Sequence, residues 1–198
     1  MTTDSEHDAR TAKAALRRQL RAARRALPAA AREDAARQLA AHAPALPGWQ
    51  PGARLAAYVA ADGELDPAPL LSAASAAGLF IYLPRVGDDR ALTFHPWVPG
   101  EALTPNRYGI GEPAAAEPLP VDALDLLCMP LVGFANDGAR LGMGAGYYDR
   151  SLAAARPQLL IGLAYDCQGV DALPREAWDV PLDGVLTETG WRPLRARA

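Results

Sequence analysis

Cysteine, histidine and lysine are scarce in this sequence. Its 198 residues include 2 cysteines and 3 histidines, and Lys13 is the only lysine. Two cysteines cannot supply the disulfide framework of a small secreted domain, and no zinc-ligand spacing is present. Cys128 and Cys167 lie in segments with little charge. This context predicts reduced, buried thiols and a cytoplasmic location.

Long hydrophobic runs are absent as well. The longest uncharged stretch, Pro67 to Pro84, is broken by proline, serine and glycine, whereas a membrane span needs about 20 mostly apolar residues. The first ten residues are polar, so we expect no signal peptide. The formal net charge of −3 gives no electrostatic case for nucleic acid. We therefore expect neither a membrane nor a nucleic-acid partner.

The composition that remains is that of an ordinary globular protein. Half of the residues are hydrophobic and 22% are charged, which excludes a disordered chain and provides enough apolar surface for a core. No internal repeat or linker divides the chain. We expect one domain over residues 1–198, with loose tails at 1–9 and 192–198.

Helical and extended patterns alternate along the chain. Leu16, Leu20, Ala23 and Leu27 form an apolar stripe at helical spacing, and the arginines of this segment fall largely off the stripe. The segment from Leu124 to Val132 is almost continuously apolar, as central parallel strands are. Helices are expected over 10–27, 29–42, 67–78 and 146–155, and strands over 54–60, 79–83, 91–97, 124–132, 159–164 and 183–187. This order predicts an α/β fold around a mostly parallel sheet.

The segment from Asn136 to Arg150 is the most informative. Its glycines 142, 144 and 146 follow an expected core strand and precede an expected helix. Glycine lets the backbone turn with positive φ, and the free N–H groups of such a loop can hold phosphate oxygens. Arg140 can add a bidentate phosphate contact, and Asp149 is placed to hold a divalent cation.

The glycine spacing matches neither the P-loop nor the dinucleotide fingerprint. A tight connection between strand and helix, with Tyr147 and Tyr148 packed in the core, is an equal alternative on the residues alone.

Three further sites each allow two interpretations. Lys13 and Arg17 are one helical turn apart and can grip a polyphosphate together, or they belong to a solvated helix face. Glu64 follows a strand end, where ligands bind in open α/β sheets, but hydrophilic turns are commoner there. Asp179 is a candidate metal carboxylate or a turn residue.

Taken together, these segments resemble the 5-formyltetrahydrofolate cyclo-ligase family, also called 5,10-methenyltetrahydrofolate synthetases, over about residues 12–188. The most specific part is Arg140–Arg150, preceded by Met129-Pro130 and Gly133-Phe134. The supporting motifs occur in the family's order and are Lys13-x-x-x-Arg17, Leu83-Pro84-Arg85, Tyr108-Gly-Ile-Gly-Glu-Pro113, Asp179-Val-Pro-Leu-Asp183 and Thr187-Glu188.

The resemblance implies a three-layer α/β sandwich of the type shared with sugar-phosphate isomerases and CoA transferases. It also implies an ATP- and Mg²⁺-dependent conversion of 5-formyltetrahydrofolate to 5,10-methenyltetrahydrofolate, with release of ADP and phosphate. The implied partners are these small molecules, and we expect a monomer or a weak homo-oligomer.

The resemblance assigns roles to particular residues. Catalytic roles are expected for Arg140, Tyr148 and Lys13. ATP contacts map onto Lys13, Arg17, Arg140, Leu141, Gly142, Met143, Gly144, Ala145, Gly146, Tyr147 and Tyr148. Folate contacts map onto Val59, Glu64, Tyr108, Met143, Gly144, Ala145, Gly146 and Tyr147. The implied metal ligands are Asp149 and Asp179.

The sequence departs from the family pattern at three positions. Gly111 stands where proline is usual, Val59 replaces a larger aliphatic residue, and Ala145 occupies a position that is lysine in some members. We expect a looser loop around Tyr108 and a larger share of phosphate binding for Arg140. Two other classes stay open, because a fold does not fix a function: a sugar-phosphate or CoA-handling enzyme, and a non-catalytic ATP- or folate-binding protein.

Overall fold

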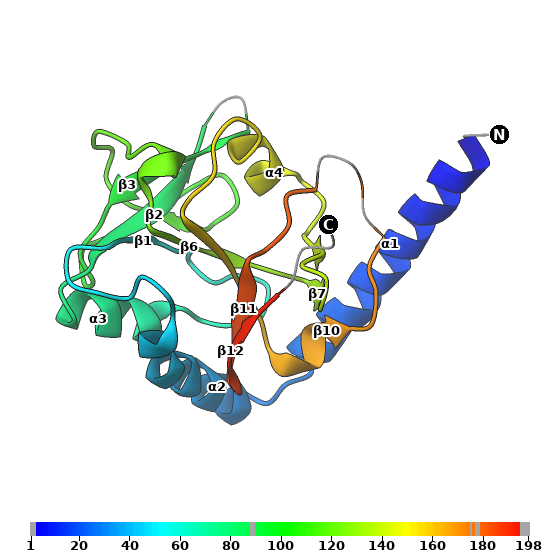
Figure 1. Ribbon diagram of the computed structural model, residues 1–198, viewed down its shortest axis with the longest axis horizontal. Helices are drawn as coiled ribbons and strands as arrows, with labels where there is room; N and C mark the ends of the chain where they lie inside the picture. The colour runs from blue at the N-terminus through cyan, green and yellow to red at the C-terminus, as the bar shows by residue number, and fades with distance from the viewer. Residues whose placement is uncertain (1–2, 88–89, 175, 177–178, 195–198) are drawn as a thin grey trace.

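The computed structural model describes residues 3–87, 90–174, 176 and 179–194. Its centre is a seven-stranded sheet with the order β12-β11-β9-β6-β1-β2-β3 (Figure 1). The inner strands are parallel, and β3 and β12 run antiparallel at the two edges. The expected mostly parallel sheet is therefore confirmed. The strands are β1 (Arg54–Ala56), β2 (Phe80–Val86), β3 (Leu92–Pro96), β6 (Leu126–Pro130), β9 (Leu159–Leu163), β11 (Gly184–Thr187) and β12 (Gly190–Pro193).

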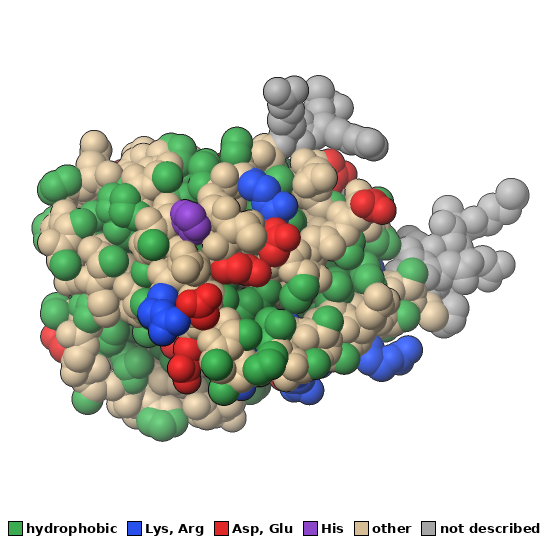
Figure 2. Space-filling view, turned by 90° about the horizontal axis from the view of Figure 1, so that it is seen from below, with side chains coloured by type: hydrophobic (Ala, Val, Ile, Leu, Met, Phe, Trp, Pro, Cys, Tyr) green, Lys and Arg blue, Asp and Glu red, His purple; other side chains and the backbone are tan. Residues whose placement is uncertain are grey.

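Two helices cover one face of this sheet, α2 (Ala29–His42) and α3 (Ala68–Ala76). The bounds of α2 agree with those expected from sequence. The N–H of Ala68 donates to the Asp66 carboxylate, 2.9 Å away, which fixes the start of α3 as a short polar side chain does at helix N-termini. On the outer side of this layer, acidic and basic side chains lie beside one another (Figure 2), as on a solvated surface.

Strand β6 shows why the central segment is continuously apolar. Leu126 and Cys128 join the core beneath α2 and α3, whereas Leu127 and Met129 join the core on the other face. Successive strand residues point to opposite faces, so a strand covered on both faces needs apolar residues throughout.

The other face is covered by α4 (Tyr147–Ser151) and by loops. Leu152, Phe94 and Leu182 are all buried there. This third layer is thinner than the layer of α2 and α3, and it completes the expected three-layer sandwich.

Helix α1 (Thr3–Arg25) lies beside a second, three-stranded sheet with the order β10-β7-β8 (Figure 1). Leu20 packs there in a cluster with Val132 and Leu141. No helix among the described residues is both long and apolar enough to cross a membrane. The short elements are β10 (Gly169–Val170), β7 (Gly133–Ala135), β8 (Arg140–Leu141), β4 (Thr104–Pro105) and β5 (Gly111–Glu112), with 3₁₀ turns at Ala43–Ala45, Val121–Ala123 and Asp166–Gln168.

The chain ends differ from the expectation. Residues 3–9, expected as a loose tail, belong to α1. Strand β11 was expected to be the last, but a turn at residues 188–189 leads into β12, which begins at Gly190 with φ of 125°. Residues 192 and 193 of the expected C-terminal tail therefore pair with β11, and residues 195–198 lie outside the described part.

Three internal elements are four or five residues shorter than expected, and one of them is the strand expected over 124–132, which covers Leu126–Pro130. The strand expected over 54–60 ends at Ala56. Helix α4 ends at Ser151 rather than at residue 155. The Ser151 hydroxyl donates to the Tyr147 carbonyl and accepts the N–H of Leu92, at 2.8 and 2.7 Å. The bond from Leu92 holds the helix end against β3. The bond back to the Tyr147 carbonyl is of the kind that weakens helix continuation.

The two cysteines are both free, but only one of them is buried. Cys128 lies inside β6, where burial raises its pKa to about 12. Cys167 is exposed, so the expectation of a buried thiol is wrong there. It lies on a 3₁₀ turn outside the sheet, where the side chain meets solvent.

Candidate active site

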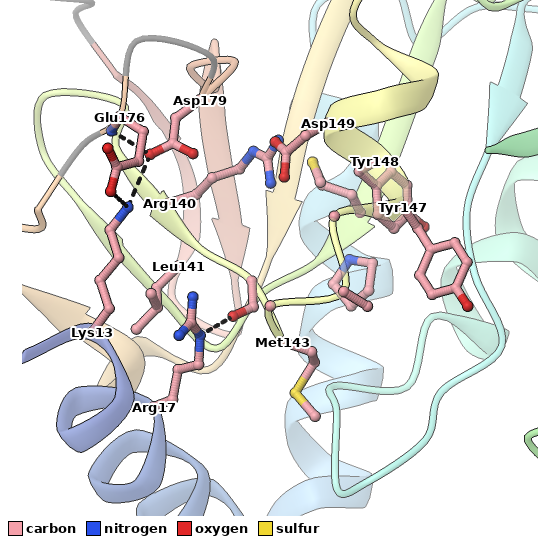
Figure 3. A pocket seen from close by; sticks show the side chains of 16 residues that line it. Lys13, Arg17, Arg140, Leu141, Met143, Tyr147, Tyr148, Asp149, Glu176 and Asp179 are labelled. Carbon is pink, nitrogen blue, oxygen red and sulfur yellow. Dashed lines mark hydrogen bonds and ion pairs between the residues drawn. The ribbon is translucent and has the colours of Figure 1, made fainter. Parts of the chain in front are cut away.

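A cavity of about 480 Å³ lies between α1, the carboxyl end of β6 and the glycine-rich loop (Figure 3). Ligand sites of α/β sheets are found at this end of the strands. All of the sequence-predicted nucleotide and metal residues come together here. The lining residues are Lys13, Arg17, Met129, Pro130, Arg140, Leu141, Gly142, Met143, Gly144, Ala145, Gly146, Tyr147, Tyr148, Asp149, Glu176 and Asp179.

Lys13 points from α1 into this pocket. Its ammonium lies 3.3 Å from the Asp179 carboxylate and 3.4 Å from that of Glu176. The Lys13 side chain is only 11% exposed, so the interpretation as a solvated helix face is wrong for this residue. The N–H of Glu176 donates to Asp179 at 2.8 Å, which orders the two acids around one cation.

Arg17 lies one turn further along α1 and faces the glycine-rich loop (Figure 3). Its Nε donates to the Gly142 carbonyl at 2.8 Å. Gly144 has φ of 96°, and a Cβ there would lie 3.5 Å from the Arg17 guanidinium. The loop conformation therefore requires glycine at this position, and α1 helps to hold it.

Arg140 and Asp149 form an ion pair on the opposite wall of the pocket. The Arg140 side chain is 5% exposed, and its Nε also donates to the Val180 carbonyl at 3.1 Å. Each of Lys13 and Arg140 thus carries an acidic partner, and the site presents alternating charges.

The acidic residues of the pocket fit a magnesium ion that is shared with phosphate. Among the described residues, no group of three or more His, Cys, Asp or Glu side chains could hold a metal by itself. Mg²⁺, however, commonly binds through one or two carboxylates together with waters and substrate phosphates. Asp149 and Asp179 both line the cavity, so they match that donor set.

The two tyrosines after the loop differ in environment. Burial raises the pKa of the Tyr148 hydroxyl above its ordinary value, so this group stays a neutral donor. Tyr147 makes a hydroxyl–hydroxyl contact with Tyr108, and their rings meet edge-on with centroids 6.2 Å apart. Tyr108 does not line the cavity, but this contact brings its loop to the pocket through Tyr147.

The departure at Gly111 has a structural explanation. A Cβ at Gly111 would lie 2.9 Å from the Cβ of Leu103, closer than packed side chains allow. Leu103 therefore fills the space that a larger residue at 111 would need, and it packs against the main core.

Val59 and Glu64 lie outside the main cavity. Val59 packs against the core beneath α2 and α3. Glu64 lines a second cavity of about 410 Å³ together with Arg32 and Tyr165. Its Oε2 accepts the N–H of Ala61 at 3.0 Å. Burial raises the pKa of Glu64, and the Ala61 N–H and the Arg24 charge oppose that rise.

Two charged residues of these two cavities and their surroundings escaped the sequence analysis. Arg24 was placed among arginines off the apolar stripe, yet its side chain is 0% exposed and pairs with Asp62 at 2.8 Å. Glu176, paired with Lys13, was not singled out. For Arg24, the sequence did contain one signal. An acidic turn, Asp62-Gly63, follows a strand, and a helix rich in arginine can supply a partner for its carboxylate.

Comparison with known proteins identifies the family. A sequence model of the 5-formyltetrahydrofolate cyclo-ligase family matches residues 9–188. This chain belongs to the 5-formyltetrahydrofolate cyclo-ligase family. It is 38% identical over 177 residues to the 5-formyltetrahydrofolate cyclo-ligase of Escherichia coli K12, with 85% of this chain and 96% of that protein covered. The Haemophilus influenzae cyclo-ligase is 36% identical over 177 residues, with 86% and 95% covered.

A solved structure agrees with this assignment. The NMR structure of Aquifex aeolicus 5,10-methenyltetrahydrofolate synthetase superposes with a TM-score of 0.79 at 30% identity, covering 94% of this chain and 93% of that one. The resemblance stated from the motifs is thereby confirmed, and the chain is assigned to a family of ligases. The roles of individual residues in the cyclo-ligase site stay predictions.

Proposed function

We propose that this chain catalyses the ATP- and Mg²⁺-dependent cyclisation of 5-formyltetrahydrofolate to 5,10-methenyltetrahydrofolate, with release of ADP and phosphate. The observation that carries this proposal is the pocket itself. Lys13, Arg17 and Arg140 converge there on a glycine-rich loop, within a chain of the cyclo-ligase family. The free thiols fit a cytoplasmic site for this reaction.

The triphosphate is expected to bind along residues 140–148. The loop can offer backbone N–H groups to phosphate oxygens, and the cations supply charge-assisted contacts. Arg17 already holds the Gly142 carbonyl, so it fixes the loop as well as adding charge. Ala145 cannot supply the cation that some family members carry there, but its carbonyl accepts a hydrogen bond from Arg150 at 2.6 Å, which places a guanidinium beside the loop.

Asp149 and Asp179 would hold Mg²⁺ together with phosphate oxygens. When bound, the ion neutralises negative charge on the transferring phosphoryl group. In the protein alone these carboxylates pair with Arg140 and Lys13. With nucleotide and ion bound, Arg140 and Lys13 would turn to the phosphates, and Asp149 and Asp179 would be free to hold the ion.

The chemical problem is that a formamide is a poor electrophile with a poor leaving group. The oxygen of the formyl group carried by N5 attacks the γ-phosphorus, and the bond from that phosphorus to the ADP oxygen breaks. N10 then attacks the formyl carbon and loses its proton, and the C–O bond breaks to release phosphate. The protein must align the formyl oxygen with the phosphorus and stabilise charge, as in other phosphoryl transfers. Arg140 and Lys13 can stabilise the negative charge on the transferred phosphoryl group, and Tyr148 can donate a hydrogen bond.

The folate is expected to lie between the loop residues 143–147 and the Glu64 turn. Glu64 can accept hydrogen bonds from the pterin, and Tyr108 can stack on it from the side of Tyr147. Arg24 lies 3.9 Å from the Glu64 carboxylate and 4.0 Å from the sulfur of Met143. The two proposed folate elements therefore adjoin, although Glu64 lines a separate cavity.

The deciding experiment is a near-UV absorbance assay for the methenyl product with ATP, Mg²⁺ and 5-formyltetrahydrofolate. Product must form only when all three are present, so ATP is omitted in one control and Mg²⁺ is chelated in another. A thermal-shift panel with ATP, folates, sugar phosphates and CoA tests the two other function classes, a sugar-phosphate or CoA-handling enzyme and a non-catalytic binding protein. A shift with ATP and folate but no product would indicate a non-catalytic binding protein, and a response to sugar phosphates alone would overturn the proposal.

A further inference from the structure

A buried arginine on α1 forms a second charged cluster next to the proposed folate site. The side chain of Arg24 is 0% exposed. A guanidinium cannot shed its charge in a protein, so burying one is costly unless every donor is paired. Each of the three nitrogens of the Arg24 guanidinium has an oxygen acceptor. Its Nη1 donates to the Leu131 carbonyl at 3.0 Å, its Nε to the Asp62 carbonyl at 3.2 Å, and its Nη2 to the Asp62 carboxylate at 2.8 Å.

The backbone conformation of Asp62 directs both its carboxylate and its carbonyl to Arg24. Its φ is 52°, a left-handed conformation that Asp tolerates better than most residues. Arg21 and Arg25 also pair with its carboxylate, but their side chains are 34% and 55% exposed. Of these three arginines, Arg24 alone also reaches Leu131 and Glu64. It therefore links α1, the segment after β6 and the 61–64 turn in one fixed geometry.

The same guanidinium faces both elements of the proposed folate site. Its Nη2 lies 3.9 Å from Oε1 of Glu64, while the other Glu64 oxygen accepts the Ala61 N–H at 3.0 Å. It also lies 4.0 Å from the Met143 sulfur in the glycine-rich loop. A movement of Arg24 would disturb both neighbours.

We propose that Arg24 is a positioning residue for folate binding, which keeps the Glu64 carboxylate charged and correctly oriented toward the pterin. The proposal rests on the function proposed above, in which Glu64 binds the pterin as a hydrogen-bond acceptor. Arg24 itself, enclosed on all sides, acts through Glu64 and does not touch the substrate.

The electrostatic surroundings of Glu64 support this role. Burial raises the pKa of its carboxyl group, and the Arg24 charge opposes the rise. The neighbouring tyrosines 58, 148 and 165 stay neutral because burial raises their pKa values too. Arg32 and Asp66 line the cavity beside Glu64 and carry opposite charges, and Asp62 is already paired with arginines. Arg24 is thus the buried cation closest to Glu64 among the described residues.

The test compares Arg24→Gln with Arg25→Gln, an exposed partner of the same Asp62. For each, KM and kcat for 5-formyltetrahydrofolate are measured at several pH values, with circular dichroism as the folding check. In Arg24→Gln we expect the folate KM to rise about tenfold or more near pH 6.5 and to recover toward pH 8.5, because the Glu64 carboxyl then ionises only at higher pH. The KM for ATP and all parameters of Arg25→Gln should stay close to wild type.

Two further variants keep the proposal testable. Glu64→Gln should raise the folate KM at every pH, and adding Arg24→Gln to it should cause little additional loss. If Arg24→Gln does not fold, Arg24→Lys retains the charge without the planar donors, and its folate KM should rise with an unchanged pH profile. A folded Arg24→Gln with a wild-type KM, or with a loss independent of pH, overturns the proposal, as does a wild-type KM in Arg24→Lys. Absence of turnover in the wild-type protein instead overturns the proposed function.

Discussion

Lys13 and Asp179 are separated by 166 positions in the chain, yet their side chains meet at 3.3 Å inside the pocket. This contact joins the first helix to the segment before the last parallel strand. Together with the Arg140–Asp149 pair, it shows that Lys13 and Arg140 each have an acidic partner in the protein alone, whereas Arg17 donates to the Gly142 carbonyl. A phosphate ligand that binds here as proposed would compete with carboxylates for Lys13 and Arg140, and this competition underlies the first three predictions.

Lys13→Ala should weaken ATP binding about tenfold or more, because one buried ammonium is lost from the proposed phosphate site. Calorimetry with ATP and Mg²⁺ measures the affinity. Arg18→Ala is the matched control, since Arg18 is an exposed residue of the same helix that does not line the pocket. Equal ATP affinity in wild type and Lys13→Ala would remove Lys13 from the site.

Arg140→Ala should lower turnover well over tenfold, since a lost charge-assisted contact in such a site costs on the order of 2–4 kcal/mol. The absorbance assay gives kcat, and circular dichroism checks the fold. Arg156→Ala is the control, because Arg156 pairs with Asp183 away from the pocket. A near-normal rate in folded Arg140→Ala contradicts the assigned role.

Asp149→Asn should reduce the benefit that Mg²⁺ gives to ATP binding. In the wild type we expect chelation of the ion to weaken ATP binding severalfold, because the ion draws the carboxylates away from Arg140 and Lys13. The ratio of the ATP affinities with and without Mg²⁺, measured by calorimetry, should fall in the variant. Asp166→Asn, which removes an exposed partner of Arg192, should keep the wild-type ratio. An unchanged ratio in Asp149→Asn would exclude it as a metal ligand.

His95 should make stability depend on pH. Burial lowers its pKa below the ordinary 6.5, and its Nδ1 accepts the N–H of Ala116 at 3.2 Å, which requires a neutral ring with its proton on Nε2. The folded state thus favours the uncharged form. Its stabilising contribution is complete above about pH 6.5 and is lost as the pH falls through the folded-state pKa. The difference in melting temperature between wild type and His95→Gln should narrow from about pH 7.5 to pH 5, and a constant difference would contradict this.

Local patterns predicted most of the framework. The bounds of α2 were predicted at both ends, and the apolar segment around β6 was correctly assigned to a strand covered on both faces. Such elements depend on periodicity and on residues close in sequence. The glycine-rich loop was found for the same reason, because three alternating glycines between a strand and a helix form a compact signal.

The errors fall where a single long-range contact decides the outcome. Helix α4 stops at Ser151 because that hydroxyl binds the backbone of β3, a partner 59 positions away. Strand β12 exists because it pairs with β11 across the turn at residues 188–189. Neither interaction changes the hydrophobic period from which the elements were predicted.

The sequence alone determined the order of the main helices and of six strands of the central sheet, the family and the glycine-rich loop, since all of these depend on contiguous segments. Only the tertiary structure decided which charges are paired. From the sequence, Arg24 is expected to be one more surface arginine of a basic helix. In the structure it is buried, because the turn at Asp62 brings a carboxylate and a carbonyl to it. Coulomb attraction and desolvation depend on distance and burial in space, and neither quantity can be obtained from the spacing of residues along a chain.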